Sequence, residues 1–153
     1  MEFMQKVPTG RDMGEWDYRD RLRDGLCIFI RVLRPADAAL IAQLTQLDPA
    51  RAVALVALDE VTGKLLGVAR LHYEDGRDGE YAILVRSRLK GLGLGWLLMT
   101  RLVEYARAIG LRQIHGLVLA ENAVMLKMCG EFGFKIADDA AERGVKRVTL
   151  ALI

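Results

Sequence analysis

Lys90-Gly91-Leu92-Gly93-Leu94-Gly95 lies between an apolar run, residues 81–85, and a run with helical spacing, residues 96–109. Three glycines at alternate positions leave the backbone nearly bare, so the chain can bend sharply and bring its N–H groups against a ligand. A helix that begins here adds free N–H groups and the positive end of its dipole. A strand, bare amides and a helix in this order indicate a binding site for a pyrophosphate.

Two common phosphate-binding motifs do not fit this stretch. A Walker loop closes with Lys followed by Ser or Thr, whereas Trp96 and Leu97 follow the last glycine here. The dinucleotide fingerprint would place a glycine where Leu98 stands, and the chain lacks the long alternation of parallel strands and helices of that fold. A tight glycine turn without a ligand is the third alternative, but three glycines and a basic residue exceed what a turn requires.

Composition sets the broad class of the protein. The chain has 153 residues, is 52% hydrophobic and carries 22 basic against 20 acidic residues, for a net charge of +2. This balance gives no argument for nucleic-acid binding, and no apolar run is long enough to span a membrane. Cys27 and Cys129 form no disulfide framework, so a reducing cytoplasm is expected. We expect a flexible leader at residues 1–18 and one domain at residues 19–153.

Hydrophobic periodicity and turn signals predict a mixed α/β sheet. A meander of strands precedes a β-α-β-α-β segment, and the strand after the first of its helices is expected to run parallel to the strand before it. The Asp24-Gly25 pair indicates a hairpin turn, and Gly110 and Gly133 are placed to end helices. Strands are expected at residues 19–22, 26–33, 52–58, 65–73, 80–85, 113–119 and 146–152, and helices at 36–47, 95–109 and 122–132.

These residues resemble the GNAT N-acetyltransferases, which use acetyl-CoA. The family's pyrophosphate loop, Gln/Arg-x-x-Gly-x-Gly/Ala, is similar to the run from Lys90 to Gly95, with Lys in the first place. A second signature, Asn after the next strand and a helix ending in Gly-Phe, is matched by Asn122 and Gly133-Phe134. The match covers roughly residues 26–153. Residues 54–58, 80–87 and 21–37 look like the catalytic domain of the Pat-type bacterial protein lysine acetyltransferases.

The resemblance implies a fold and a set of site residues. The fold is a mostly antiparallel sheet with one parallel, splayed pair and helices on both faces. Glu80 looks like the general base, because an amine with a pKa of ~10.4 must lose a proton before it attacks. Backbone N–H groups near Val85 are placed to donate to the thioester oxygen. Acetyl-CoA would be bound by Leu84, Val85, Lys90, Gly91, Leu92, Gly93, Leu94, Gly95, Trp96 and Asn122, with no metal.

Other residues near the expected site allow more than one interpretation. Asn122 fits both a helix N-cap and a bond to the pantetheine arm. Cys129 stands where many family members have Tyr, which removes one candidate acid, and an apolar filler is its simpler interpretation. His72 is a second base only if it faces the cleft, and His115 is expected to be structural. Met125, Met128 and Phe132 are expected in the core.

The acceptor is less well defined than the donor. Family members usually have two helices between the first strand and the next, whereas residues 33–52 leave room for one, which reduces the roof over the acceptor. The favoured function is acetyl transfer to a protein lysine. A small-molecule amine as acceptor and a non-catalytic acyl-CoA-binding module are the alternatives. A homodimer that completes the groove is also left open.

Overall fold

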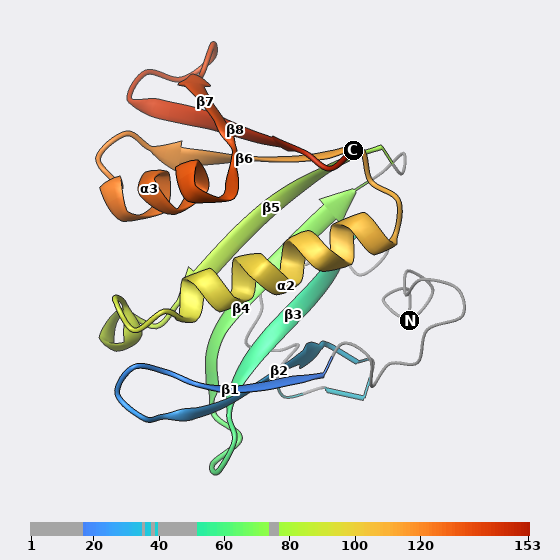
Figure 1. Ribbon diagram of the computed structural model, residues 1–153, viewed down its shortest axis with the longest axis vertical. Helices are drawn as coiled ribbons and strands as arrows, with labels where there is room; N and C mark the ends of the chain where they lie inside the picture. Colours follow the sequence, from blue (N-terminus) through green and yellow to red (C-terminus); the bar gives the residue numbers. More distant parts are fainter. Residues whose placement is uncertain (1–16, 35, 38, 40–51, 74–76) are drawn as a thin grey trace.

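The computed structural model describes residues 17–34, 36–37, 39, 52–73 and 77–153. Over these residues the chain forms a curved sheet with two α-helices packed on it (Figure 1). The strands are β1 (Tyr18–Arg21), β2 (Cys27–Val32), β3 (Ala52–Asp59), β4 (Leu65–Tyr73), β5 (Asp78–Val85), β6 (Gln113–Leu119), β7 (Lys135–Asp138) and β8 (Val145–Ala151). The helices are α2 (Leu94–Ala108) and α3 (Ala123–Phe132), and a single 3-10 turn covers Ser87–Leu89.

The sheet has the strand order β1-β2-β3-β4-β5-β6-β8-β7. Each described pair of neighbours is antiparallel except β5 and β6, which run parallel. The parallel pairing holds at three register positions, the last of which joins Glu80 to His115. Beyond that pair β5 and β6 separate, so the expected mixed sheet with one parallel, splayed pair is confirmed. We call the opening between residues 81–85 and 116–119 the fork.

The expected elements are confirmed to within two residues wherever the structure describes them, with one exception. Strand β7, which pairs antiparallel with β8, was not expected from the sequence. The helix expected at residues 36–47, which would cover the second face of the sheet, falls almost wholly outside the described residues. Of the expected leader, only residues 17 and 18 are described, and Tyr18 already belongs to β1.

Helix α2 packs on the middle of the sheet and supplies much of the core. Its Leu98, Leu102 and Tyr105 side chains have no exposed surface, as their spacing predicted. Ile109, expected on the same face, is only partly buried and follows the end of the helix. A smaller cluster on the opposite face of the sheet consists of Leu33, Ala54, Val56, Leu58 and Val68.

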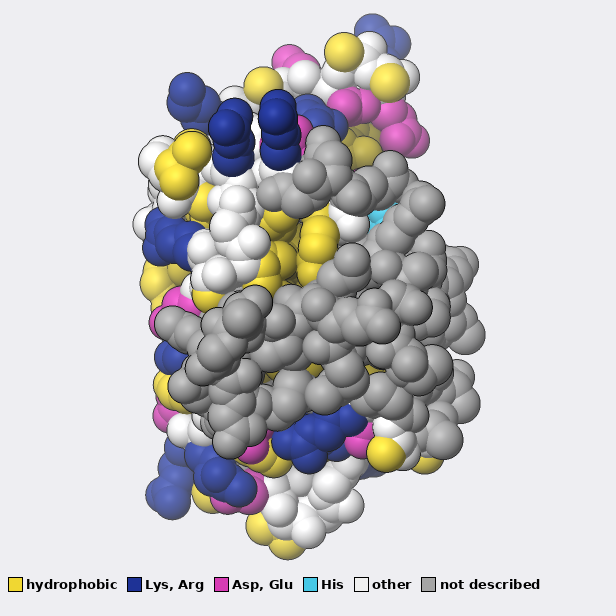
Figure 2. All heavy atoms as spheres, turned by 90° about the vertical axis from the view of Figure 1, so that its right-hand side faces the viewer, with side chains coloured by type: hydrophobic (Ala, Val, Ile, Leu, Met, Phe, Trp, Pro, Cys, Tyr) yellow, Lys and Arg dark blue, Asp and Glu magenta, His cyan; other side chains and the backbone are white. Residues whose placement is uncertain are grey.

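The described surface carries its charge in separate groups. In Figure 2 the visible Lys and Arg side chains stand at both ends of the molecule and singly along its left edge, and form no continuous patch. Within the ranges that the structure describes, no helix is long and apolar enough to cross a bilayer.

Gly116 on β6 lies against the ring of Tyr81 on β5. A Cβ atom at Gly116 would be 2.5 Å from Cε1 of Tyr81, and the ring is only 6% exposed. We therefore expect Gly116→Ala to lower the free energy of unfolding by about 2–3 kcal/mol, because the buried ring must shift. Chemical denaturation measures this. Gly130→Ala is the control: Gly130 lies in α3 with open space around it, so this change should be neutral or mildly stabilising.

Candidate active site

The glycine loop bends as its sequence predicted. After the 3-10 turn at Ser87–Leu89, Gly91 and Gly93 adopt φ of +84° and +95°, values that side chains other than glycine adopt at a cost. Gly93 is the N-cap of α2. Two left-handed residues two positions apart turn the chain directly from the end of β5 into the helix.

The first turn of α2 offers free backbone donors at this bend. The first helical hydrogen bond runs from the Leu97 N–H to the Gly93 oxygen at 3.1 Å, so the N–H groups of Leu94, Gly95 and Trp96 have no helical partner. No acidic residue stands in this turn. The positive end of the helix dipole is thus not compensated by a carboxylate of its own first turn, and an anion is favoured here.

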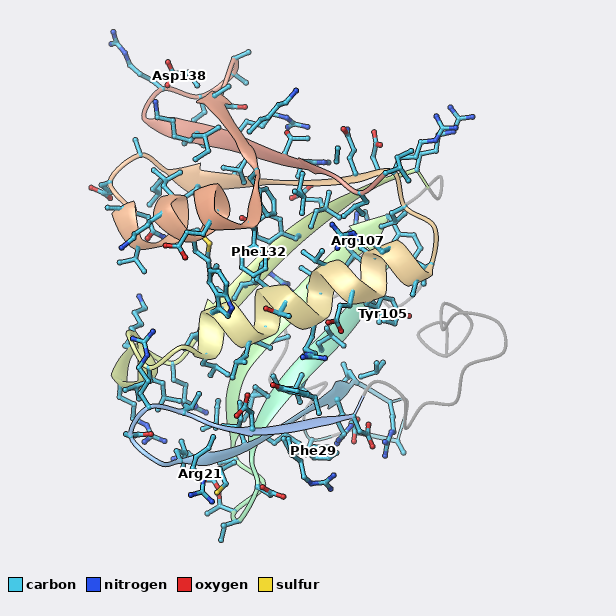
Figure 3. The ribbon with its side chains drawn as sticks, in the orientation of Figure 1. Arg21, Phe29, Tyr105, Arg107, Phe132 and Asp138 are labelled. Atoms are coloured by element: carbon cyan, nitrogen blue, oxygen red, sulfur yellow. The ribbon has the colours of Figure 1, made fainter. Side chains whose placement is uncertain are left out.

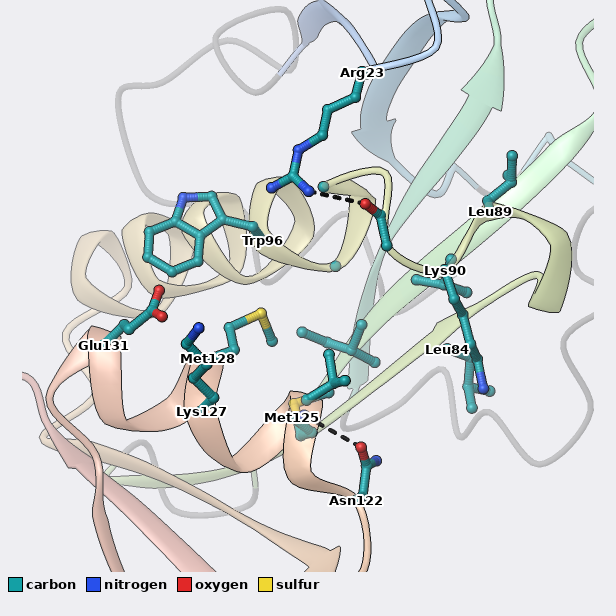
Figure 4. A pocket seen from close by; sticks show the side chains of 16 residues that line it. Arg23, Leu84, Leu89, Lys90, Trp96, Asn122, Met125, Lys127, Met128 and Glu131 are labelled. Atoms are coloured by element: carbon teal, nitrogen blue, oxygen red, sulfur yellow. Dashed lines mark hydrogen bonds between the residues drawn. The ribbon is translucent and has the colours of Figure 1, made fainter.

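A cavity of about 740 Å³ opens in front of these donors, a size typical of ligand sites (Figure 4). It extends from the arm of the fork on β5, past the glycine loop, to α3. Eight of the ten residues expected to bind the cofactor line it: Leu84, Val85, Lys90, Gly91, Gly93, Gly95, Trp96 and Asn122. The other two, Leu92 and Leu94, turn their side chains to the core, so only their backbone is available to a ligand.

Sequence reasoning missed half of the residues that line the cavity. The missed residues are Arg23, Ile83, Leu89, Val124, Met125, Lys127, Met128 and Glu131. The expectation that Met125 and Met128 belong to the core is only partly right, because both are half-buried and form one wall of the cavity. Residues 124, 128 and 131 have the spacing of one helix face, which the sequence shows. That this face of α3 is turned toward the glycine loop is known only from the structure.

Two aromatic rings stand where α2 and α3 approach each other. Phe132 projects from α3 toward α2 (Figure 3), and its ring centroid is 4.4 Å from that of Trp96. Trp96 is 41% exposed and lines the cavity. The pair therefore joins the two helices beside the cavity, and part of the Trp96 surface remains accessible there.

Asn122 caps α3. Its side-chain oxygen accepts a hydrogen bond from the Met125 N–H at 3.2 Å. We expect Asn122→Ala to lower the free energy of unfolding by about 1 kcal/mol. Asn122→Ser keeps a capping oxygen, so it should lower the free energy of unfolding by only a few tenths of a kcal/mol. Thermal unfolding of the two variants measures the cap. Binding of CoA to Asn122→Ser then reports any separate contact of the amide, and unchanged affinity would leave the cap as its only role.

Glu80 lies at the closed end of the fork. Its register partners are His72 on β4 and His115 on β6, so the three side chains share one face of the sheet, the face opposite α2. Glu80 is exposed and is not among the residues that line the cavity. His72, whose orientation the sequence left open, therefore stands beside Glu80, and so does His115, which was expected to be structural.

The surroundings of His115 keep its ring neutral at neutral pH. Burial lowers its pKa below the usual value, and Arg147 adds to this, while the carboxylates of Glu80 and Asp78 act in the opposite direction. Its Nδ1 atom is buried without a hydrogen-bond partner among the described residues. A neutral imidazole therefore stands next to Glu80 on this face of the sheet.

Cys129 is buried in α3 against Tyr81. Its Sγ atom is 3.4 Å from the Tyr81 hydroxyl, and burial raises the pKa of the thiol, which stays protonated at neutral pH. An inert buried thiol agrees with the expectation of an apolar filler. Across the part of the chain that the structure describes, no cluster of His, Cys, Asp or Glu could hold a metal ion.

Known proteins resemble this chain in sequence and in fold. An acetyltransferase of Pseudomonas aeruginosa is 34% identical over 110 residues, which are 69% of this chain and 59% of that protein. This chain thus spans less than two thirds of that relative.

Two solved structures share the fold. The GNAT domain of the Streptomyces lividans protein PAT has a TM-score of 0.74 and 21% identity, over 92% of this chain and 99% of that one. Salmonella typhimurium YncA, solved with its cofactor acetyl-CoA, has a TM-score of 0.63 and 20% identity, over 82% of this chain and 94% of that one. The acetyltransferase (GNAT) family model matches residues 18–134, and the chain belongs to this family.

Proposed function

We propose that this domain transfers the acetyl group of acetyl-CoA to a primary amine, with the lysine of a protein as the favoured acceptor. The observation that carries the proposal is the cavity that joins the fork to the free N–H groups at the start of α2. A long ligand with an anionic group at one end and a reactive group at the other fits this path. Acetyl-CoA has its diphosphate and its thioester in that order.

The charges around the cavity favour such a donor. Among the described residues, Arg23, Lys90 and Lys127 line it against one carboxylate, that of Glu131. The donors of Leu94, Gly95 and Trp96 would meet the diphosphate, and the pantetheine arm would pass Met125 and Met128 into the fork. A backbone N–H near Val85 would then donate to the thioester oxygen as negative charge develops there.

Glu80 is proposed as the general base. The amine nitrogen attacks the thioester carbonyl carbon, a C–N bond forms, and the C–S bond breaks. The Glu80 carboxylate first takes one proton from the ammonium form of the acceptor, directly or through one water, and the second N–H proton leaves to solvent as the amide forms. CoA leaves as a thiolate, a modest base with a pKa of ~8.5, and takes its proton from solvent. His72 and His115 flank the carboxylate and are available to pass that proton on.

Three exposed leucines support a protein acceptor. Leu84 on β5 and Leu117 and Leu119 on β6 are 58%, 53% and 56% exposed. By their register they lie on the same face as Glu80, on the two arms of the fork. An open apolar surface suits the aliphatic part of a lysine side chain and its neighbours in a peptide better than it suits a small polar cation, which would need an acidic pocket.

A thiol-release assay with acetyl-CoA tests the proposal. The acceptor panel contains lysine peptides with free side-chain amines, the same peptides with acetylated lysines, and polyamines and other small amines. We expect release of CoA with the free lysine peptides only. Release of CoA with the small amines but not with the lysine peptides would show that the acceptor is a small molecule. If acetyl-CoA binds but no amine in the panel causes release of CoA, the domain is a non-catalytic acyl-CoA-binding module.

A further inference from the structure

The turn of the first hairpin lies against the glycine loop. Between β1 and β2 the Leu22 N–H donates to the Leu26 oxygen and the Gly25 N–H to the Leu22 oxygen, both at 2.9 Å. Leu22 is 4% exposed and belongs to the main core, so this turn is anchored. Arg23 is the next residue and is directed toward the loop (Figure 4).

Arg23 contacts the loop twice. Its Nη1 atom donates to the Gly91 oxygen at 2.9 Å, and its backbone N–H donates to the Leu92 oxygen at 3.4 Å. These bonds join residues 68 positions apart in the sequence. They hold two carbonyl oxygens of the loop on the side of the hairpin, so that these oxygens do not turn toward a bound anion.

The guanidinium has donors left for a ligand. It carries five N–H bonds in a planar fork, and the contact with Gly91 uses one of them. Arg23 also lines the cavity and lies close over the loop, because a Cβ at Gly93 would be 4.0 Å from its Nε, an ordinary contact distance. In Figure 4 the Lys90 side chain runs away from Arg23, so Arg23 is the cation that reaches over the glycines.

The hairpin is fixed to α2 at a second point. Arg101 of α2 stacks over the ring of Tyr18 with 3.7 Å between its Cζ and the ring centroid, and the Tyr18 hydroxyl donates to Asp20 at 2.6 Å. The hairpin is thus held at both ends of β1, by the glycine loop at Arg23 and by α2 at Tyr18.

We propose that Arg23 is a positioning and binding residue for the diphosphate: it holds the glycine loop through the Gly91 carbonyl and gives its remaining donors to the phosphate oxygens. This inference rests on the proposed use of acetyl-CoA. The inference adds to the cofactor site a residue of the β1–β2 hairpin, which lies far before the glycine loop in the sequence.

Calorimetric binding of CoA and of 3′-dephospho-CoA to Arg23→Ala tests this. Both ligands keep the diphosphate, so we expect both dissociation constants to rise roughly tenfold or more, with a weaker dependence on salt. Arg23→Lys keeps the charge but lacks the planar fork, and should fall between the wild type and Arg23→Ala. Arg21→Ala is the control, since Arg21 lies on the far side of the same hairpin from α2 (Figure 3) and does not line the cavity.

Each outcome decides between the two proposals. No binding of CoA to the wild-type protein would overturn both the use of acetyl-CoA and the role of Arg23. Binding to the wild type with unchanged affinity in Arg23→Ala would overturn the role of Arg23 alone. Loss of affinity for CoA but not for dephospho-CoA would move Arg23 to the 3′-phosphate and contradict the diphosphate assignment. An equal loss of affinity for CoA in Arg21→Ala would show that the effect comes from the net positive charge of the hairpin, and would overturn the specific role of Arg23.

Discussion

Glu80→Gln is expected to lower kcat/KM for acetyl transfer by a factor of ~10²–10⁴, the range that a positioned general base contributes. The amide has the size of the carboxylate but cannot accept the proton of the attacking amine. Because the side chain is exposed and outside the cavity lining, the dissociation constant of acetyl-CoA and the unfolding temperature should stay unchanged. Thiol release, calorimetric binding and thermal unfolding measure the three quantities on one preparation.

Asp78→Asn provides the matched comparison. Asp78 stands two residues earlier on β5 and on the same face, so the change removes a neighbouring carboxylate without touching the end of the parallel pairing. We expect its kcat/KM to stay within about threefold of the wild type, a difference of less than 1 kcal/mol in transition-state energy. Full turnover in Glu80→Gln would show that Glu80 is not the base. An equal loss in Glu80→Gln and Asp78→Asn would show that the effect comes from the negative charge at this end of β5 and not from proton transfer.

Gly93→Ala is expected to weaken acetyl-CoA binding by roughly tenfold or more. Gly93 has φ of +95° at the N-cap of α2, a conformation that costs a residue with a Cβ roughly 1–2 kcal/mol. The loop can relieve this strain only by turning, which redirects the N–H groups of Leu94 and Gly95. Binding of CoA by calorimetry measures the loss.

Gly110→Ala separates loop geometry from general strain. Gly110 follows the other end of α2, has φ of +85° and has open space around it, so its backbone strain matches that of Gly93. Both variants should lose similar unfolding free energy, about 1–2 kcal/mol, but only Gly93→Ala should lose affinity. Equal affinities in the two variants would show that the loop does not set the ligand site.

The parts of this protein that were predictable are those that local chemistry decides. Asp24-Gly25 fixed the first hairpin turn, the spacing of Leu98, Leu102 and Tyr105 fixed the buried face of α2, and the three glycines fixed the sharp loop. Each of these signals lies within a few residues of the structure it forms. The Asn122 cap is of the same kind, because its partner is three residues away.

The remainder depends on contacts between distant segments. All four residues of β7 are exposed and show no alternation, so that strand exists only because β8 lies beside it. The position of Arg23 over the glycine loop follows from where the hairpin packs on α2. The placement of His115 beside Glu80 requires the register of the parallel pair, which no local pattern contains.

The short pairing of β5 with β6 also has a mechanical consequence. Over the described residues the sheet consists of two fully antiparallel blades, one from β1 to β5 and one of β6, β8 and β7. The strand pairing between them is limited to Asp78–Gln113, Gly79–Ile114 and Glu80–His115. A rotation of one blade against the other about the last of these pairs would widen the fork at the expense of the contact of Tyr81 with Gly116 and of the packing of α3, while every antiparallel ladder stays intact. The pivot of such a motion passes through Glu80, so the proposed base would keep its place while the opening for the thioester changes width.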